Sequence, residues 1–243
     1  MPQNVLSILT FLPLVGAIIL LCMKRPQDQP DDHGHGSHDA HGEEEATPKA
    51  PKDPARTAIC GVALLFTVLP LLLSLGLFMQ FDAGFTAAAQ GIGKHIQYTE
   101  DVNWINIGAM HIHYKMGVDG ISLLLILLTT FLMVLCVGFS FRVKTRLKEF
   151  MVFMLMLETG MIGVFCALDL VLFYIFWEAM LIPMYFLIGI FGHERRIHAA
   201  IKFFLFTFAG SIFMLIAIVA TYMIAGSFDV VALSDPLSGA GGL

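Results

Sequence analysis

The sequence predicts an all-α polytopic membrane protein with six transmembrane helices and a small β-hairpin outside the membrane. The first observation is composition: 57% of the 243 residues are hydrophobic and only 14% are charged, with a mean hydropathy of +0.79. A soluble domain would carry roughly a quarter charged residues. The second is a set of six apolar runs, each close to the ~20 residues that cross the hydrocarbon core of a bilayer. The third is the distribution of basic residues, which gather in alternate loops.

The six apolar runs are predicted to be helices, because a helix satisfies its own backbone hydrogen bonds in lipid. A barrel strand would instead alternate in polarity over about half that length. The first run has no basic residue before it and no small-residue cleavage site after it, so a span is expected there rather than a signal peptide. The predicted spans are Val5–Met23, Thr57–Met79, Gly120–Phe141, Phe150–Leu168, Leu170–Phe191 and Ala199–Ile224.

The loops predict an orientation. Twelve of the 14 Lys and Arg residues follow the first, third and fifth spans, and by the positive-inside rule these loops face the cytoplasm. Both ends of the chain are then expected on the outer side of a membrane, which we expect to be a bacterial inner membrane. The predicted segments are a first helix (1–23), a cytoplasmic loop (24–56), a second helix (57–79), an outer loop (80–119), four further helices (120–226) and an outer tail (227–243).

The cytoplasmic loop at 24–56 contains "HGHGSHDAHGEEE", flanked by prolines. Such a composition cannot bury a core and predicts disorder. Neutral imidazole is a good metal ligand, so a weak Zn or Ni site is one interpretation, although we favour a solvated tract. The histidines of that site would be His33, His35, His38 and His41.

The outer loop contains "VNWINIGAMHIHYKMGVDG", in which polar and apolar residues alternate around Gly108 and Ala109. This pattern predicts a β-hairpin lying on the outer surface. Asp119 follows the hairpin and precedes the third span. A helix cap is the interpretation we favour for it over a role in proton transfer.

Two carboxylates lie inside predicted spans. Glu178 lies within the apolar stretch "FYIFWEAMLIPMYFLIGIFG", and Glu158 lies in the preceding span. Each is about ten residues, or roughly 15 Å, from the turn near Asp169, so both are expected near the bilayer midplane. A charge at that depth costs about 2.5–3.5 kcal/mol on insertion scales, and loss of water favours the protonated carboxyl. Proton translocation is therefore expected of Glu178, whereas for Glu158 a structural hydrogen bond is an equal alternative.

The surroundings of Glu178 predict a polar path. Tyr174 is four residues before it and Tyr185 seven residues after it, so both share its helix face. Pro183 lacks a backbone donor, which frees a carbonyl one turn earlier and is expected to kink the helix. Whether Glu158 meets this face is not decided by the sequence.

The sixth span carries two further features. Lys202 lies about one turn inside it and is predicted either to take part in proton translocation or to anchor the helix at the cytoplasmic interface. It is not expected to reach Glu178, which is about 13 residues, or roughly 20 Å, from the cytoplasmic end of its own helix. Ala209, Gly210 and Ser211 form a patch of small residues suited to close helix packing.

No cofactor or metal site is predicted in this chain outside the His-rich loop. The four cysteines lie in apolar runs without a Cys-x-x-Cys pair, and no Gly-x-Gly-x-x-Gly follows a strand. Redox chemistry, if the protein serves it, is therefore expected on other chains. The cysteines are Cys22, Cys60, Cys136 and Cys166.

Three stretches, "YKMGVDGISLLLILLTTFL", "LETGMIGVFCALDLVLFYIFWEAMLIPMYFLIGIFG" and "IKFFLFTFAGSIFMLIAI", closely resemble the chain M family of bacterial NADH–quinone oxidoreductase. This family is the equivalent of mitochondrial subunit 4 and is an antiporter-like family of respiratory complex I. The resemblance is dense over residues 110–226 and loose over the first two spans, and the His-rich insert is not part of it. In the family, the glutamate that matches Glu178 pairs with a lysine on the seventh helix.

The resemblance implies a translocase subunit without a redox centre, which moves protons across the membrane. NADH oxidation and quinone reduction would occur on other subunits, which would hold NAD, FMN, iron–sulfur clusters and quinone. The expected partners are other membrane-arm subunits and the lipid bilayer, and no nucleic acid. Family members carry two inverted repeats, so six spans would form an incomplete antiporter-like fold.

Two alternatives stay open at this point. A subunit of a multisubunit sodium/proton antiporter or of a membrane-bound hydrogenase would share the antiporter-like fold. A metal transporter using the His-rich loop would need metal ligands inside the spans, and no predicted span contains a histidine.

Overall fold

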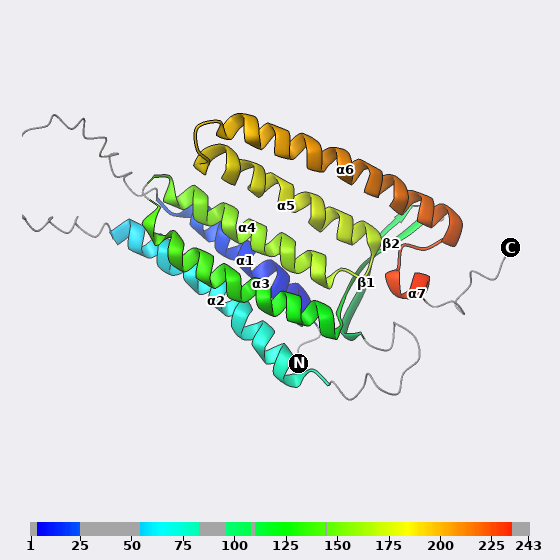
Figure 1. Cartoon of the computed structure of the whole chain (residues 1–243). Coiled ribbons are helices and arrows are strands. Elements are labelled where there is room, and N and C mark those ends of the chain that lie inside the picture. The colour runs from blue at the N-terminus through cyan, green and yellow to red at the C-terminus, as the bar shows by residue number, and fades with distance from the viewer. Residues whose placement is uncertain (1–3, 25–53, 83–95, 108–109, 144, 235–243) are drawn as a thin grey trace, which may run out of the picture.

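The computed structural model of the chain describes residues 4–24, 54–82, 96–107, 110–143 and 145–234 (Figure 1). Within these residues, six helices are long and apolar enough to cross a membrane, as the hydropathy pattern predicted. The elements are α1 (Val5–Cys22), α2 (Pro54–Gln80), β1 (Gln97–Ile107), β2 (Met110–Val118), α3 (Gly120–Phe139), the 3₁₀ turn η3 (Ser140–Arg142), α4 (Leu147–Cys166), α5 (Leu170–Phe191), α6 (Arg196–Ala225) and α7 (Val230–Ser234).

The predicted hairpin is confirmed. Strands β1 and β2 pair antiparallel, with Ile107 opposite Met110 as the last pair before the turn. β1 begins at Gln97, five residues before the predicted alternation starts at Val102. The turn residues 108–109 lie outside the described part of the chain, as do most of the His-rich loop (25–53) and the end of the tail (235–243).

The hairpin also changes where α4 ends. The hydropathy pattern predicted a helix to Leu168, but α4 ends at Cys166. Ala167 forms a β-bridge with Met116, and the Leu168 N–H donates to the carbonyl of Lys115 at 2.9 Å. The Ala167 N–H still donates to the carbonyl of Gly163 as the last bond of the helix, but at Leu168 the chain pairs with the hairpin, a choice that hydropathy cannot distinguish.

Two aspartates begin membrane helices. Asp119 accepts a hydrogen bond from the Ser122 N–H at 2.7 Å, and the Ser122 hydroxyl accepts one from the Asp119 N–H at 2.9 Å. This reciprocal capping box satisfies free donors at the start of α3 and confirms the predicted cap. Asp169 caps α5 without a reciprocal bond, by accepting hydrogen bonds from the N–H groups of Val171 and Leu172.

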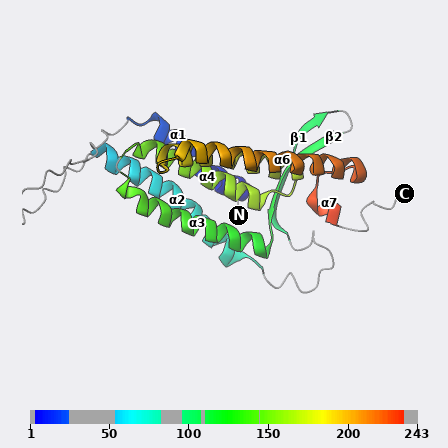
Figure 2. The same ribbon diagram turned by 45° about the horizontal axis from the view of Figure 1, so that its top comes forward.

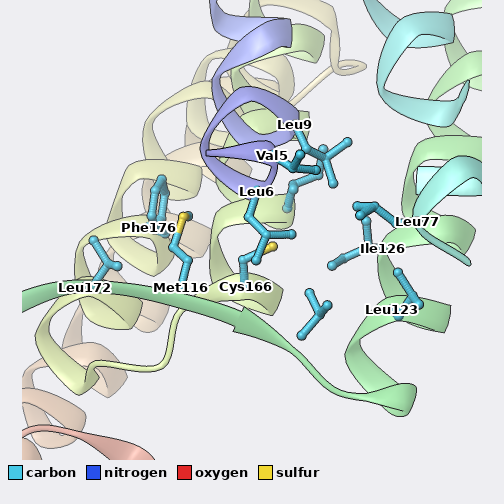
Figure 3. Packing of buried hydrophobic residues seen from close by; sticks show 12 residues of the cluster. Val5, Leu6, Leu9, Leu77, Met116, Leu123, Ile126, Cys166, Leu172 and Phe176 are labelled. Atoms are coloured by element: carbon cyan, nitrogen blue, oxygen red, sulfur yellow. The ribbon is translucent and has the colours of Figure 1, made fainter. Parts of the chain in front are cut away.

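The helices surround α4, which contacts α1, α2, α3 and α5. α6 lies at one edge of the bundle, where it packs on α5 (Figures 1 and 2). We call the end of the bundle that carries β1 and β2 the hairpin end, and the other the loop end. α1 starts and α7 lies at the hairpin end, where a core cluster from α1, α2, α3, α4, α5 and β2 closes the bundle (Figure 3).

Charged groups cap both ends of α1. At the hairpin end, the buried Glu100 of β1 accepts hydrogen bonds from the N–H groups of Leu6 at 2.6 Å and Ser7 at 3.2 Å. At the loop end, the Lys148 ammonium donates to the carbonyls of Leu21 and Met23. An anion at the N-terminus and a cation at the C-terminus both complement the helix dipole. α1 is thus held at each end by a residue distant in sequence.

Candidate functional site

The contact between α4 and α5 sets which way α5 faces. A Cβ atom at Gly163 would lie 2.3 Å from Cδ1 of Phe176, and one at Gly160 would lie 2.4 Å from Cγ of Met180. The two glycines therefore let the helices approach closely, with Phe176 and Met180 on the side of α5 that faces α4. Glu178 is two residues, or about 200° around the helix, from Phe176. It projects from the opposite side of α5.

The side of α5 that carries Glu178 is covered by α6. Tyr174, one turn earlier on α5, interacts through its side chain with both Glu178 and Ser211 of α6. Ser211 is buried, and its hydroxyl also donates to the carbonyl of Phe208 at 2.9 Å. Oxygen Oε1 of Glu178 is buried and has no hydrogen-bond partner within the described part of the chain. We call Tyr174, Glu178 and Ser211 the α5–α6 polar cluster.

The predicted companions of Glu178 lie on two different sides of α5. Tyr185 faces α6, where its ring meets that of Phe204 edge-on with centroids 5.7 Å apart. Pro183 is buried and lies seven residues after Phe176, so it is on the side toward α4. α5 continues through Pro183 to Phe191 as one α-helix. Tyr185 thus shares the face of Glu178 as predicted, and Pro183 does not.

The depth of Glu178 agrees with the sequence analysis. It lies eight residues after Leu170, the first residue of α5, which is about 12 Å along the helix axis. A hydrocarbon core is about 30 Å thick, so the carboxyl is near its middle. Phenol and serine hydroxyls each donate and accept hydrogen bonds. A carboxyl with an unpartnered oxygen beside the Tyr174 hydroxyl, which in turn interacts with Ser211, can take up a proton and pass it on.

Glu158 occupies a separate site. It is fully buried, and neither carboxyl oxygen has a hydrogen-bond partner in the described residues. It lies two residues before Gly160 and so about 200° away from the side of α4 that faces α5. Leu155 and Ile162, on either side of it along the helix, belong to buried clusters formed with α1, α2 and α3. Glu158 therefore points into the bundle of the first four helices.

The two carboxylates thus share a depth but not a site. Glu158 is eight residues from Cys166, the hairpin end of α4, just as Glu178 is eight residues from the hairpin end of α5. Each projects away from the contact between the two helices. The packed contact at Gly160 and Gly163 lies between them. The structure does not bring them together as one pair.

Lys202 is also apart from Glu178. It lies nine residues before Ser211 on α6, which places it about 180° around the helix. Since Ser211 faces α5, Lys202 is on the outward side of α6, where it is exposed and lines a shallow hollow with His198. This agrees with the expectation that Lys202 does not reach Glu178.

Ser211 is the member of the polar cluster that the sequence analysis missed. It stands in a small-residue patch that was interpreted only as a packing site. Its hydroxyl could be assigned a polar role only once the register of α6 against α5 was known. The caps Glu100 and Lys148 were missed for the same reason, because their partners on α1 are distant in sequence.

The described residues contain no group of three or more His, Cys, Asp or Glu side chains that could hold a metal ion. The predicted histidine site in the loop at 24–56 lies outside them. All four cysteines are free thiols, and Cys166 alone of the four is buried. The described part of the chain thus offers ionisable groups, not a metal centre, as its candidate for chemistry.

The NADH:quinone oxidoreductase/Mrp antiporter transmembrane family matches residues 167–240. Subunit M of NADH-quinone oxidoreductase from Rhodobacter capsulatus is 48% identical over 231 residues, which are 95% of this chain and 38% of that protein. NADH-ubiquinone oxidoreductase chain 4 of Marchantia polymorpha is 39% identical over 174 residues, 70% of this chain and 33% of that protein. The chain therefore spans little more than a third of the length of these relatives.

Two solved structures show the same fold. A chain of respiratory complex I from Thermus thermophilus, with NADH bound to the complex, matches with a TM-score of 0.63 at 24% identity, covering 94% of this chain and 38% of that one. A chain of the archaeal membrane-bound sulfane sulfur reductase matches with a TM-score of 0.63 at 19% identity, covering 93% of this chain and 29% of that one.

Six apolar helices, with carboxyl groups buried near the middle of the bilayer, define an integral membrane protein that carries ionisable groups within its bundle. Such groups are costly in lipid and mark functional sites in membrane proteins. With the similarities above, the chain belongs to the antiporter-like family of membrane subunits that includes subunit M of NADH–quinone oxidoreductase and its mitochondrial equivalent, chain 4.

Proposed function

We propose that the chain acts in the membrane arm of an NADH–quinone oxidoreductase and that Glu178 carries protons through it. The observation that carries the proposal is the buried, unpartnered Oε1 of Glu178 beside Tyr174, whose side chain also interacts with Ser211 of α6. The similarity to subunit M supports the assignment to this complex. The chain's own part is non-redox, and NADH, flavin, iron–sulfur and quinone chemistry occur on other subunits.

The polar cluster supplies the proton-transfer steps. Glu178 accepts a proton at its free carboxyl oxygen and becomes neutral, which suits its apolar surroundings. The hydroxyls of Tyr174 and Ser211 then relay that proton from Glu178 to an acceptor group elsewhere in the complex, because each can accept one proton while giving up another. Return of Glu178 to its ionised form completes the transfer. Conformational changes driven by quinone reduction elsewhere in the complex alternate the two forms.

The other predicted residues have separate parts in this proposal. Glu158 stores a proton inside the bundle of α1 to α4, without direct exchange with Glu178. Lys202 lies on the outer side of α6, so any part it takes in proton movement is at the surface of the loop end. The positive-inside rule directs the loop end to the cytoplasm, which orients the membrane-arm subunit with its hairpin outside.

The test is substitution of Glu178 in the complete complex, with its other subunits present. Glu178→Gln keeps the shape and hydrogen-bonding capacity but cannot carry a proton. It is expected to lower NADH–quinone turnover and ΔpH formation together by at least about tenfold, since a positioned proton-transfer group contributes roughly 10²–10⁴-fold. Glu178→Asp is expected to retain more activity. Tyr174→Phe is expected to slow turnover less than Glu178→Gln, because water can replace one hydroxyl.

The matched control is Glu194→Gln, which removes an exposed carboxyl in the turn between α5 and α6. It is expected to leave both rates unchanged. Assembly of each variant is checked on a native gel. Normal turnover and pumping in assembled Glu178→Gln complex would remove Glu178 from the proton path.

A second candidate function is a subunit of a multisubunit sodium/proton antiporter. The matched family covers Mrp antiporters as well as NADH:quinone oxidoreductases. Proton transfer through the polar cluster is compatible with either function. The two are separated by the ion requirement in membranes that contain the chain. ΔpH formation driven by a sodium gradient, in the absence of NADH, would favour the antiporter, whereas NADH-driven ΔpH without sodium supports the oxidoreductase.

A further inference from the structure

The outward side of α6 carries a hollow that the proton path does not use. It has a volume of about 380 Å³ and is lined by His198, Ile201, Lys202, Leu205, Phe206 and Ala209. A second hollow of about 330 Å³ lies on the other side of Ile201 and Leu205, where α6 meets α5. Both hollows open to the surroundings of the bundle. Two of the side chains that line the first hollow are strongly exposed, Leu205 at 60% and Phe206 at 82%.

The two polar residues of the hollow stand at one end of it. His198 and Lys202 are one helical turn apart and share a face of α6. Within the described residues, no hydrogen bond or ion pair involves either side chain. Lys202 lies six residues, or about 9 Å, inside the start of α6. An ammonium group at this depth that has no anionic partner in the protein is stabilised by an anionic group from outside the chain.

The other charged groups nearby reinforce a positive surface. Arg195 is exposed in the turn before α6, and the Arg196 guanidinium donates to the carbonyl of Ile190 at 2.8 Å. Glu194 is the one carboxylate in the turn 192–195, and it is exposed to water rather than placed in the hollow. The loop end of α6 therefore presents a net positive charge above an apolar groove.

We propose that this hollow binds one anionic phospholipid. The phosphate lies between His198 and Lys202, which supply an N–H donor and an ammonium. One acyl chain lies along Leu205, Phe206 and Ala209. Ala209 is seven residues, or about 10 Å, from Lys202 toward the middle of the membrane, so the groove runs in the direction that an acyl chain takes from its headgroup. Its small side chain leaves room for the chain.

The proposal favours an anionic lipid over a zwitterionic one on charge. The Lys202 ammonium repels the cationic part of a phosphatidylcholine headgroup, and no carboxylate of the described residues lines the hollow to pair with that cation. A phosphatidylglycerol headgroup carries a net negative charge and meets no such repulsion. Basic residues at a membrane surface attract anionic lipids, and the hollow adds a fixed position for one of these lipids.

The test uses the full chain in nanodiscs of phosphatidylcholine that contain a minor fraction of phosphatidylglycerol. Native mass spectrometry measures which lipid stays bound. Phosphatidylglycerol is expected to be enriched on the wild-type chain. Lys202→Ala is expected to reduce this enrichment at least about fivefold, a change of roughly 1 kcal/mol. Lys202→Arg keeps the charge and is expected to retain the enrichment.

Two further variants separate the proposed site from general attraction. Arg195→Ala removes one positive charge at the same end of α6 but outside the hollow, and is expected to change the enrichment less than twofold. Ala209→Phe keeps every charge and fills the groove, and is expected to reduce the enrichment as Lys202→Ala does. Equal effects of Lys202→Ala and Arg195→Ala would overturn the site in favour of diffuse attraction.

An unaffected Ala209→Phe variant would overturn the acyl groove and leave only a phosphate contact. The same measurement in the assembled complex gives the remaining check. If phosphatidylglycerol is not retained there and Lys202 is protected from amine-modifying reagents by protein, another helix covers the hollow and the lipid proposal fails. None of these outcomes bears on Glu178, which lies on the opposite side of α6 from Lys202.

Discussion

Adding one methyl group at Gly163 tests whether the α4–α5 contact orients the site. A Cβ atom there would lie 2.3 Å from Cδ1, 2.5 Å from Cε1 and 2.5 Å from Cγ of Phe176. A rigid aromatic ring cannot relieve three such contacts by a change at its tip. Either the ring of Phe176 leaves its position or α5 moves outward, and Glu178 is only two residues away along the same helix.

The expected change in unfolding free energy for Gly163→Ala follows from two opposed effects. Overpacking in a core costs about 1–3 kcal/mol, whereas Gly→Ala inside a helix contributes roughly 0.5–1 kcal/mol of stability. Three ring contacts of 2.5 Å or less place Gly163→Ala in the upper part of the overpacking range, about 2–3 kcal/mol, so the expected net loss is about 1–2.5 kcal/mol. At roughly 2–4 °C per kcal/mol for a chain of this size, the thermal midpoint is expected to fall by about 2–10 °C.

The assay is thermal unfolding of the purified chain in detergent, followed by circular dichroism. Gly76→Ala is the matched control, because Gly76 lies inside α2 and a Cβ there meets no heavy atom within 4 Å. It is expected to leave the midpoint unchanged or raise it. Gly160→Ala is expected to fall between the two, because the flexible side chain of Met180 can move aside.

A midpoint for Gly163→Ala equal to that of Gly76→Ala would refute the reasoning. It would mean that α5 is not held at this distance from α4. The orientation of Glu178 toward α6, which depends on that contact, would then lose its basis.

Three further predictions concern the helix ends. Glu100→Ala leaves buried N–H groups of α1 without their acceptor and is expected to cost about 1–3 kcal/mol of unfolding free energy, measured by denaturant titration. Glu100→Gln keeps an acceptor, so equal losses of stability in the two variants would contradict the role of Glu100 as a cap. Lys148→Met removes the donor to the last carbonyls of α1 and is expected to cost about 1.5–3 kcal/mol, while Lys24→Met, at an exposed position, serves as its control. Burial raises the pKa of Asp169 above its ordinary 3.8, although hydrogen bonds from backbone N–H groups oppose the change. The protonated Asp169 carboxyl therefore stabilises the folded chain fully at pH values below the pKa of Asp169 in the unfolded chain. This stabilisation is lost as the pH rises through the pKa of Asp169 in the folded chain. Asp169→Asn keeps the cap and does not titrate, so the free energy of unfolding measured from pH 3 to 7 should fall less with pH in the variant than in the wild type. Identical slopes of unfolding free energy against pH would contradict this role of Asp169.

Several features could be predicted from the sequence because they are local. A span depends on about 20 consecutive residues, so the six helices were recognisable from hydropathy alone. The cap at Asp119 depends on a residue three positions away. The hairpin depends on alternation on either side of one turn. The common depth of Glu158 and Glu178 follows from counting residues from the turn between their helices.

Helix ends were less predictable where another element competes for the backbone. Ala167 and Leu168 are as apolar as the helix before them, yet they pair with β2. Hydropathy measures the preference of a side chain for lipid or a core, and it gives no information on which carbonyl a given N–H hydrogen-bonds to. α7 was missed because its five residues are too few to show a period.

The sequence by itself determined the number of spans, their depth and the presence of a carboxyl at the middle of the fifth. Only the tertiary structure decided that Glu158 faces the first four helices, that Glu178 lies on the side of α5 toward α6 and that Lys202 faces outward. The physical reason is that a membrane helix is surrounded by lipid rather than by water. In water, the apolar side of a helix identifies its core, but in lipid the outer side is as apolar as the inner one. The rotation of each helix is then set by close contacts, such as Gly163 against Phe176, which exist only once the helices have packed.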